Sequence, residues 1–139
     1  MGNRIYTKEI WGNPVLGDDN VIGRCTVIGH GVVIGSHCKI EDHVFIPPGV
    51  TIGDFVFIGP GVVFTNDKYP CVKPMDDNRF RRVVVNDYVS IGANCTILPG
   101  VTLGVGCFVA AHSNVTKSVP MYKKVKGNPA RVYGDVKHG

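Results

Sequence analysis

The sequence lacks the long apolar run that a membrane-spanning helix requires, and its first residues lack the apolar stretch of a signal peptide. It also lacks the composition of a disordered chain, because 44% of its residues are hydrophobic, 19% are charged and the mean hydropathy is +0.10. Its 139 residues are too few for two ordinary cores, so we expect a single domain over residues 1–139. These exclusions predict a soluble, cytoplasmic protein.

Aromatic side chains and cysteine pairs are also scarce. Aromatic residues make up 9% of the chain, with one Trp, and the five cysteines include no C-x-x-C pair. A zinc knuckle is therefore not expected, and without a secretory signal the cysteines are interpreted as thiols. Cys25 and Cys71 have no predicted role. The net charge of +4 suits a polyphosphate ligand better than nucleic acid, because no helical or aromatic-interleaved basic motif is present.

Glycine, in contrast, is abundant, at 18 of 139 residues against an average share near 7%. An aliphatic residue or Phe recurs every six residues over 16–64 and again over 85–115. A second column of small or β-branched residues lies two positions earlier, and glycines follow at fixed offsets. A helix would need spacings of three and four, so the pattern predicts short strands separated by turns. Both columns share one strand face and form the predicted core, which includes Cys38, Cys95 and Cys107.

The period is interrupted over residues 65–84, where two prolines and eight charged residues predict a long loop. Loops on a rigid scaffold are frequent locations of functional sites. The basic residues Arg79, Arg81 and Arg82 are compatible with a solvated surface and with contacts to phosphate. The period ends for good after Val115, so residues 116–139 are expected to form a short basic tail outside the repeat.

Residues 91–131, which include V-T-K-S-V-P and G-N-P-A-R, resemble the C-terminal half of the hexapeptide acyltransferases that use acetyl-coenzyme A. The resemblance implies an all-β fold, the left-handed parallel β-helix, with three hexapeptides in each coil of about 18 residues and about five coils. It also implies a homotrimer with coenzyme A between subunits, and no metal. The residues that match cofactor positions are Ala93, Ala111, Thr116, Lys117 and Arg131.

Residues 38–70 contain C-K-I-E-D-H-V-F-I and F-T-N-D-K-Y-P, which are similar to bacterial N-acetyltransferases of nucleotide-linked 3-amino sugars. This resemblance implies acetyl transfer to the amino group of such a sugar, in cell-surface polysaccharide biosynthesis. The matching site residues are His43, Asn66 and Asp67. Cys71 stands where those enzymes usually have Arg, and residues 132–135 also depart from their pattern, so the sugar is left open.

The acceptor chemistry favours an amine. A sugar hydroxyl needs a strong general base, usually His, and related O-acetyltransferases keep His-Pro where this chain has Tyr69-Pro70. An amine attacks unaided once neutral, so Asn66 and Asp67 are expected to orient it, with Asp67 as a candidate proton acceptor. The sequence does not show whether His43 shares a site with Asp67 of its own chain or of a neighbour.

Three other functions remain open at this stage. They are a sugar O-acetyltransferase of the same fold, a non-catalytic β-helix that serves as a scaffold, and a γ-type carbonic anhydrase with three His on zinc. The histidine spacing does not reproduce the zinc arrangement. We expect His30 and His37 at solvent-exposed turns, and His112 beside the cofactor position Ala111.

Overall fold

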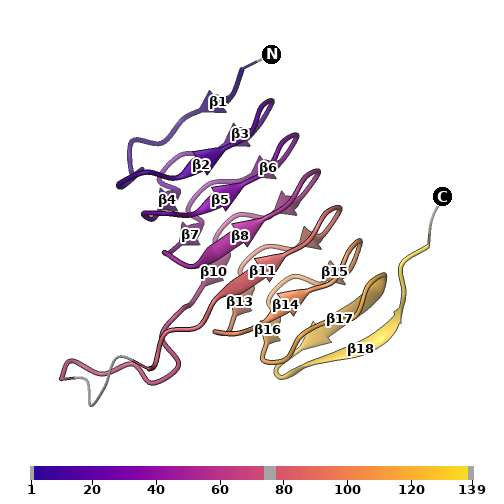
Figure 1. Cartoon of the computed structure of the whole chain (residues 1–139). Coiled ribbons are helices and arrows are strands. Elements are labelled where there is room, and N and C mark those ends of the chain that lie inside the picture. The colour runs from indigo at the N-terminus through magenta and orange to yellow at the C-terminus, as the bar shows by residue number, and fades with distance from the viewer. Residues whose placement is uncertain (1, 74–77, 138–139) are drawn as a thin grey trace.

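The computed structural model describes residues 2–73 and 78–137 of the chain (Figure 1). All regular elements among these residues are short β-strands, which form three sheets. Met1, the centre of the predicted loop (74–77) and the last two residues of the predicted tail (138–139) lie outside the described residues.

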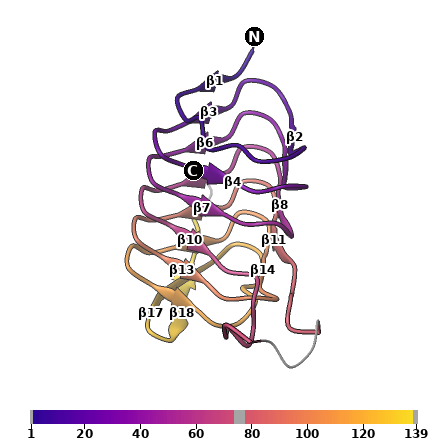
Figure 2. The same ribbon diagram turned by 90° about the vertical axis from the view of Figure 1, so that its left-hand side faces the viewer.

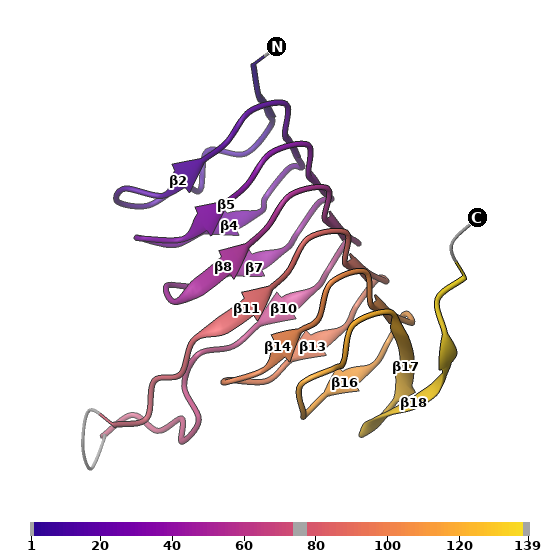
Figure 3. The same ribbon diagram turned by 45° about the vertical axis from the view of Figure 1, so that its right-hand side comes forward.

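The three sheets are the faces of a prism, and the chain passes from one to the next in the repeating order 3, 1, 2 (Figures 2 and 3). Face 1 contains β1 (Arg4–Ile5), β3 (Val21–Ile22), β6 (Lys39–Ile40), β9 (Phe57–Ile58), β12 (Ser90–Ile91), β15 (Phe108–Val109), β17 (Lys123–Gly127) and β18 (Ala130–Asp135). Face 2 contains β4 (Val27–Ile28), β7 (Phe45–Ile46), β10 (Val63–Phe64), β13 (Thr96–Ile97) and β16 (Asn114–Val115). Face 3 contains β2 (Val15–Leu16), β5 (Val33–Ile34), β8 (Val50–Ile52), β11 (Val83–Val85) and β14 (Thr102–Leu103).

Strand pairing confirms the predicted coil. Val15 pairs with Val33 and Val27 with Phe45 in parallel register, so each regular coil takes 18 residues, or three hexapeptides. The number of coils is slightly higher than the predicted five. Faces 2 and 3 have five strands each, whereas face 1 has eight. The three extra strands lie outside the six-residue period: β1 and β17 stack in parallel on the two ends of face 1, and β18 pairs antiparallel with β17.

The two predicted columns form the core. All their members are buried except Leu16, which is partly exposed in the first coil. Ile, Val and Leu dominate this interior, and Cys38, Cys95 and Cys107 fill three of its small positions with exposed fractions of 2%, 0% and 1%. The prediction of these cysteines as small core residues is therefore confirmed.

Each edge of the prism carries a repeated left-handed residue, at which the chain turns from one face to the next. Edge 3–1 has Asp19, His37, Phe55, Tyr88 and Gly106. Edge 1–2 has Cys25, His43, Gly61, Asn94 and His112. Edge 2–3 has Gly31, Gly49 and Gly100. Glycine adopts a positive φ without the steric cost that other residues pay, so edge 2–3 turns at these three positions without a side chain.

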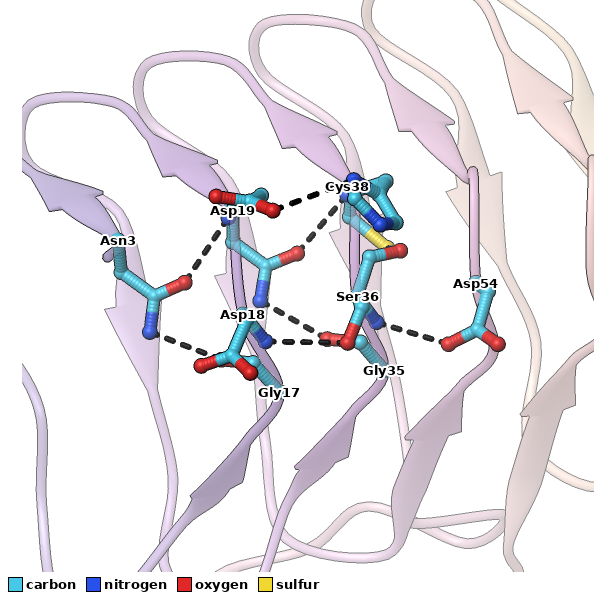
Figure 4. Close-up of polar contacts among 10 residues, drawn as sticks. Asn3, Gly17, Asp18, Asp19, Gly35, Ser36, Cys38 and Asp54 are labelled. Carbon is cyan, nitrogen blue, oxygen red and sulfur yellow. Dashed lines mark hydrogen bonds and ion pairs between the residues drawn. The ribbon is translucent and has the colours of Figure 1, made fainter. Parts of the chain in front are cut away.

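Polar side chains connect successive coils inside edge 3–1 (Figure 4). The amide nitrogen of the Asn3 side chain donates to the carbonyl of Gly17 at 2.9 Å, and its oxygen accepts from the Asn20 N–H at 2.9 Å. One coil later Asn20 repeats this pattern, donating to Gly35 and accepting from the Cys38 N–H, both at 2.8 Å. The bonds to the N–H groups of Asn20 and Cys38, which are both buried residues, satisfy backbone donors that would otherwise be buried without partners.

The long loop leaves the prism at edge 2–3, between the ends of β10 and β11, and projects away from the coils (Figure 1). It covers residues 65–82 rather than the predicted 65–84, because β11 begins at Val83. The coil that contains the loop takes 33 residues, measured along the hydrogen bond from the Asp54 N–H to Asp87, against 18 in a regular coil. The base of the loop is antiparallel, with an isolated bridge between Asp67 and Phe80.

The tail is more regular than predicted. β17 adds to face 1 in parallel with β15, and β18 then folds back antiparallel on β17. Val125 of β17 is buried at 3% exposure, so the tail extends the apolar core by one layer. This hairpin brings Arg131 back to the last complete coil.

Candidate active site

A cleft of about 580 Å³ lies on edge 2–3, where the base of the loop meets the coils. The residues that line it are His30, Gly31, Pro48, Gly49, Asn66, Phe80, Arg81 and Arg82. They come from two successive turns of the edge and from both strands of the loop base. Of the three predicted catalytic residues, only Asn66 lines this cleft.

Asn66 is oriented by the neighbouring coil. Its side-chain amide nitrogen donates to the carbonyl of Pro48 at 2.9 Å, and its own backbone carbonyl accepts from the Arg81 N–H at 2.8 Å. Because the nitrogen is engaged, the amide presents its oxygen as an acceptor, and no donor among the described residues bonds to that oxygen. Asn66 therefore offers a fixed hydrogen-bond acceptor in the cleft.

Asp67 holds the loop together. One carboxylate oxygen lies 3.1 Å from Nε of Arg79, and the other accepts from the Tyr69 N–H at 3.0 Å. The Arg79 guanidinium also lies over the ring of Phe80, 4.6 Å from its centroid. Asp67 does not line the cleft beside it. Its carboxylate is thus committed to contacts within the loop base.

His43 lies on a different edge of the prism. It is an exposed, left-handed residue of edge 1–2, and its N–H donates to the carbonyl of Arg24 at 2.9 Å. β7 separates His43 from Pro48, and Asn66 contacts Pro48, so His43 and Asn66 lie at opposite ends of face 2. A single chain does not bring them together.

His30 is a cleft residue that the sequence did not single out. It is exposed, as expected of its turn, but it lies in the cleft with Asn66. Its place in the cleft could have been predicted from the repeat, because Pro48 follows His30 by one coil of 18 residues and both lie on the edge from which the loop leaves. The other exposed histidine, His37, stacks on Phe55 with ring centroids 4.7 Å apart on edge 3–1.

The predicted cofactor residues fall into two groups. Ala93 and Ala111 are stacked on edge 1–2, where the N–H of His112 donates to the carbonyl of Ala93 at 2.8 Å. A Cβ on Gly92 would lie 2.6 Å from the Ala111 nitrogen, so the coils approach closely here and glycine is required. The predicted stacking of the two alanines is confirmed, and His112 does lie beside Ala111.

The second group is at the last coil. Lys117 and Arg131 line one cleft of about 190 Å³ together with the apolar residues Val115, Val119, Val125, Ala130 and Val132 and with Ser118. Thr116 follows β16 directly and leads to Lys117. The hairpin of β17 and β18 is what places Arg131 beside the same cleft as Lys117, although a whole strand lies between them in the sequence.

The core thiols are poor nucleophiles. Burial raises the pKa of Cys107 to about 12 and also raises the pKa of Cys38 and Cys95. A thiol that stays protonated does not attack.

Within residues 2–73 and 78–137 the structure contains no group of three or more His, Cys, Asp or Glu that could hold a metal ion. The same residues contain no helix that could span a membrane.

Comparison with known proteins adds to this geometry. The family model "Bacterial transferase hexapeptide (six repeats)" matches residues 13–48 and 32–66. A hexapeptide-repeat-containing acetyltransferase of Vibrio cholerae is 31% identical with a TM-score of 0.66, and the match covers 84% of this chain and 74% of that one. A variant of GDP-perosamine N-acetyltransferase from Caulobacter crescentus, solved with CoA and GDP-perosamine, is 20% identical with a TM-score of 0.82 over 97% of this chain and 58% of that one. At this identity the second likeness is one of fold.

The matches to curated proteins cover only part of the length of those proteins. The 2,3,4,5-tetrahydropyridine-2,6-dicarboxylate N-acetyltransferase of Staphylococcus aureus is 50% identical over 50 residues, which are 36% of this chain and 21% of that protein. The chain spans less than a third of the length of this and two other curated relatives that it matches. These matches therefore support the acetyltransferase class more than any one acceptor.

Proposed function

Because this chain belongs to the hexapeptide-repeat acetyltransferases, we propose that it transfers an acetyl group from acetyl-coenzyme A to the amino group of a nucleotide-linked amino sugar. The observation that carries the acceptor class is the fixed oxygen of Asn66 in the cleft of edge 2–3. An amine has N–H groups to donate, and an oriented amide oxygen is suited to hold it. The GDP-perosamine N-acetyltransferase with the same fold acts on a compound of this class.

In the proposed reaction the neutral amine attacks the thioester carbonyl. A C–N bond forms and the C–S bond breaks. The proton that the attacking amine releases ends on the departing sulfur, so coenzyme A leaves as a thiol. Asn66 contributes by holding the amine in line for attack, which is a positioning effect. Asp67 supports this arrangement indirectly through its ion pair with Arg79, and we assign it no proton-transfer role.

Acetyl-coenzyme A is proposed to bind along the prism through the two groups of residues described above. The pantetheine chain is proposed to run along edge 1–2 past Ala93 and Ala111, where small residues let successive coils approach closely. Thr116, Lys117 and Arg131 lie at the last coil, where two basic side chains suit the phosphates of the adenosine end. Coenzyme A bound to the Vibrio cholerae and Caulobacter crescentus proteins supports the assignment of the co-substrate.

A homotrimer completes the proposal. His43 and Asn66 lie on different edges of one chain, so a site that uses both needs two copies of the chain. In the proposed trimer the prisms pack in parallel, with edge 1–2 of one copy facing edge 2–3 of the next. His43 of one subunit would then meet the thioester that faces Asn66 of its neighbour.

The test is an acetyl-transfer assay with a panel of nucleotide-linked amino sugars and their hydroxyl analogues, followed by release of the coenzyme A thiol. We expect turnover with a 3-amino sugar and little with its 3-hydroxy analogue. Asn66→Ala should lower kcat/KM by about 10-fold or more, because it removes the oriented acceptor. Equal rates with the amine and the hydroxyl would overturn the N-acetyl assignment.

A further inference from the structure

Edge 2–3 differs from the other two edges in its backbone hydrogen bonds. On edge 3–1 the left-handed His37 donates its N–H to Asp18 at 2.9 Å, and on edge 1–2 His43 donates to Arg24 at 2.9 Å. On edge 2–3 the N–H groups of Gly31 and Gly49 make no hydrogen bond to any described residue. Both glycines line the cleft. Two backbone donors, one coil apart, are thus available within its lining.

His30 adds a donor that is held in place. Its Nδ1 accepts a hydrogen bond from the N–H of Asn13 at 3.3 Å, which assigns the proton of the neutral ring to Nε2. Gly12 packs against the same ring so closely that a Cβ there would lie 2.2 Å from Nδ1. The segment before β2 therefore fixes both the tautomer and the position of a ring that lines the cleft.

Two arginines complete the lining. Arg81 uses part of its guanidinium on the carbonyls of Asn78 and Phe80, and Arg82 is exposed and makes no ion pair or hydrogen bond with any part of the chain that the structure describes. Among residues 2–73 and 78–137 no Asp or Glu lines the cleft, and the carboxylate of the nearby Asp67 is paired with Arg79. The described wall is rich in hydrogen-bond donors and positive charge.

We propose that this cleft binds the phosphate groups of the acceptor, with Arg82, the Nε2–H of His30 and the N–H groups of Gly31 and Gly49 as their donors. Backbone N–H groups in turns together with arginine are a common way of binding phosphate. The inference rests on the proposed function, since it places the diphosphate of the nucleotide in the cleft in which Asn66 holds the amine. The volume of about 580 Å³ is within the range of small-molecule sites.

The experiment measures binding of UDP, dTDP, GDP and inorganic pyrophosphate by calorimetry, with no acetyl-coenzyme A present. We expect at least one nucleoside diphosphate to bind, and pyrophosphate to compete with it. Arg82→Gln should raise the Kd by about 10-fold or more, as expected for loss of a charge-assisted hydrogen bond. Arg4→Gln is the matched control, because it removes the same charge from an exposed position on β1 and should leave the Kd unchanged.

A second variant blocks the cleft without touching an arginine. Gly31→Asn adds a side chain at a position where an added Cβ would have no other atom within 4 Å. Asn tolerates the left-handed conformation, as Asn94 does at φ 57°, so the variant should fold with a Tm close to that of the parent. It should nevertheless lose most nucleotide binding.

The binding of nucleotide and the transfer of acetyl are measured separately, so the failure of one proposal can be told from the failure of the other. Nucleotide binding that depends on Arg82 and Gly31, with no acetyl transfer to any amino sugar, supports the phosphate site and removes the proposed reaction. Acetyl transfer to an amine in a chain that binds no nucleoside diphosphate overturns the phosphate site and leaves the transferase assignment. Parental Kd values for both Arg82→Gln and Gly31→Asn also overturn it.

Discussion

Asn20 places an amide inside a largely apolar prism, with an exposed fraction of 1%. Its side chain bonds the Gly35 carbonyl and the Cys38 N–H, both at 2.8 Å. Asn20→Ala leaves the Cys38 N–H buried and unpaired, whereas the Gly35 carbonyl keeps its 3.2 Å bond from the Gly17 N–H, so we expect the free energy of unfolding to fall by about 1–3 kcal/mol. Urea unfolding measures this change. Thr102→Ala, on the exposed side of β14, is the control and should stay within about 0.5 kcal/mol; an equal loss in both variants would contradict the role of the amide.

The five thiols should differ sharply in reactivity. Cys25 and Cys71 are exposed, whereas Cys38, Cys95 and Cys107 are buried, so a thiol reagent at pH 8 should label two cysteines in the native protein and five after denaturation. Burial raises the pKa of Cys107 from its ordinary 9.0 to about 12. The unfolded chain therefore loses this proton first, and stability that is complete below pH 9 should decline as the pH rises from 9 toward 12. Labelling of more than two native thiols at pH 8 would show that the core is open.

The sequence allows some of these residues to be assigned and not others. A buried position such as Cys38 follows from the six-residue period alone, because the period states which side chains point inward. Asn66 in the cleft follows from a motif. The ion pair of Asp67 with Arg79 does not, since it depends on how a non-periodic segment folds back on itself. The period places His30 one coil before Pro48, but the contacts that fix its ring come from Gly12 and Asn13, which lie before the six-residue period begins.

At the scale of elements, the loop is an insertion in one edge of a regular coil. The coil that contains it takes 33 residues from Asp54 to Asp87, in place of 18. Deleting residues 67–81 restores the regular coil length, so we expect the prism to fold with an unchanged β-sheet circular dichroism spectrum. The deletion removes Phe80 and Arg81 from the cleft and should abolish acetyl transfer. Coenzyme A binding should persist, because its proposed contacts lie outside the loop; loss of the β spectrum would mean that the loop stabilises the coils.

At the scale of the whole molecule, each face of the prism carries partly exposed apolar side chains on its outer surface. On face 2, Phe45 is 43% exposed and pairs with Val63, which is 37% exposed. Apolar side chains that adjoin in this way favour burial against another surface. We expect a homotrimer, with three times the 15.0 kDa mass of the chain, in light scattering. A mass near 15.0 kDa at micromolar concentration would contradict it.

A complementation experiment tests where the sites lie in that trimer. His43→Asn and Asn66→Ala change residues of different edges, so after subunit exchange some sites combine an intact His43 from one chain with an intact Asn66 from another. We expect the mixture to be more active than either variant alone. If the activity of the mixture equals the mean of the two variants, the two residues do not act together in a site between subunits.

Because the core positions of all coils are filled by similar aliphatic side chains, the core stabilises the correct strand register little more than a shifted register. A strand displaced by one repeat or by one whole coil would bury an equivalent set of Ile and Val side chains, so the interior alone specifies the register poorly. The distinction comes from edge 3–1, where Ser36 accepts from the N–H of Asp18 at 3.0 Å and Asp54 accepts from the N–H of Ser36 at 2.8 Å (Figure 4). A slipped coil would lose such pairs. Substitutions along this edge should therefore appear first as slow or incomplete refolding, while the same number of changes among the buried aliphatic residues would appear as lower stability.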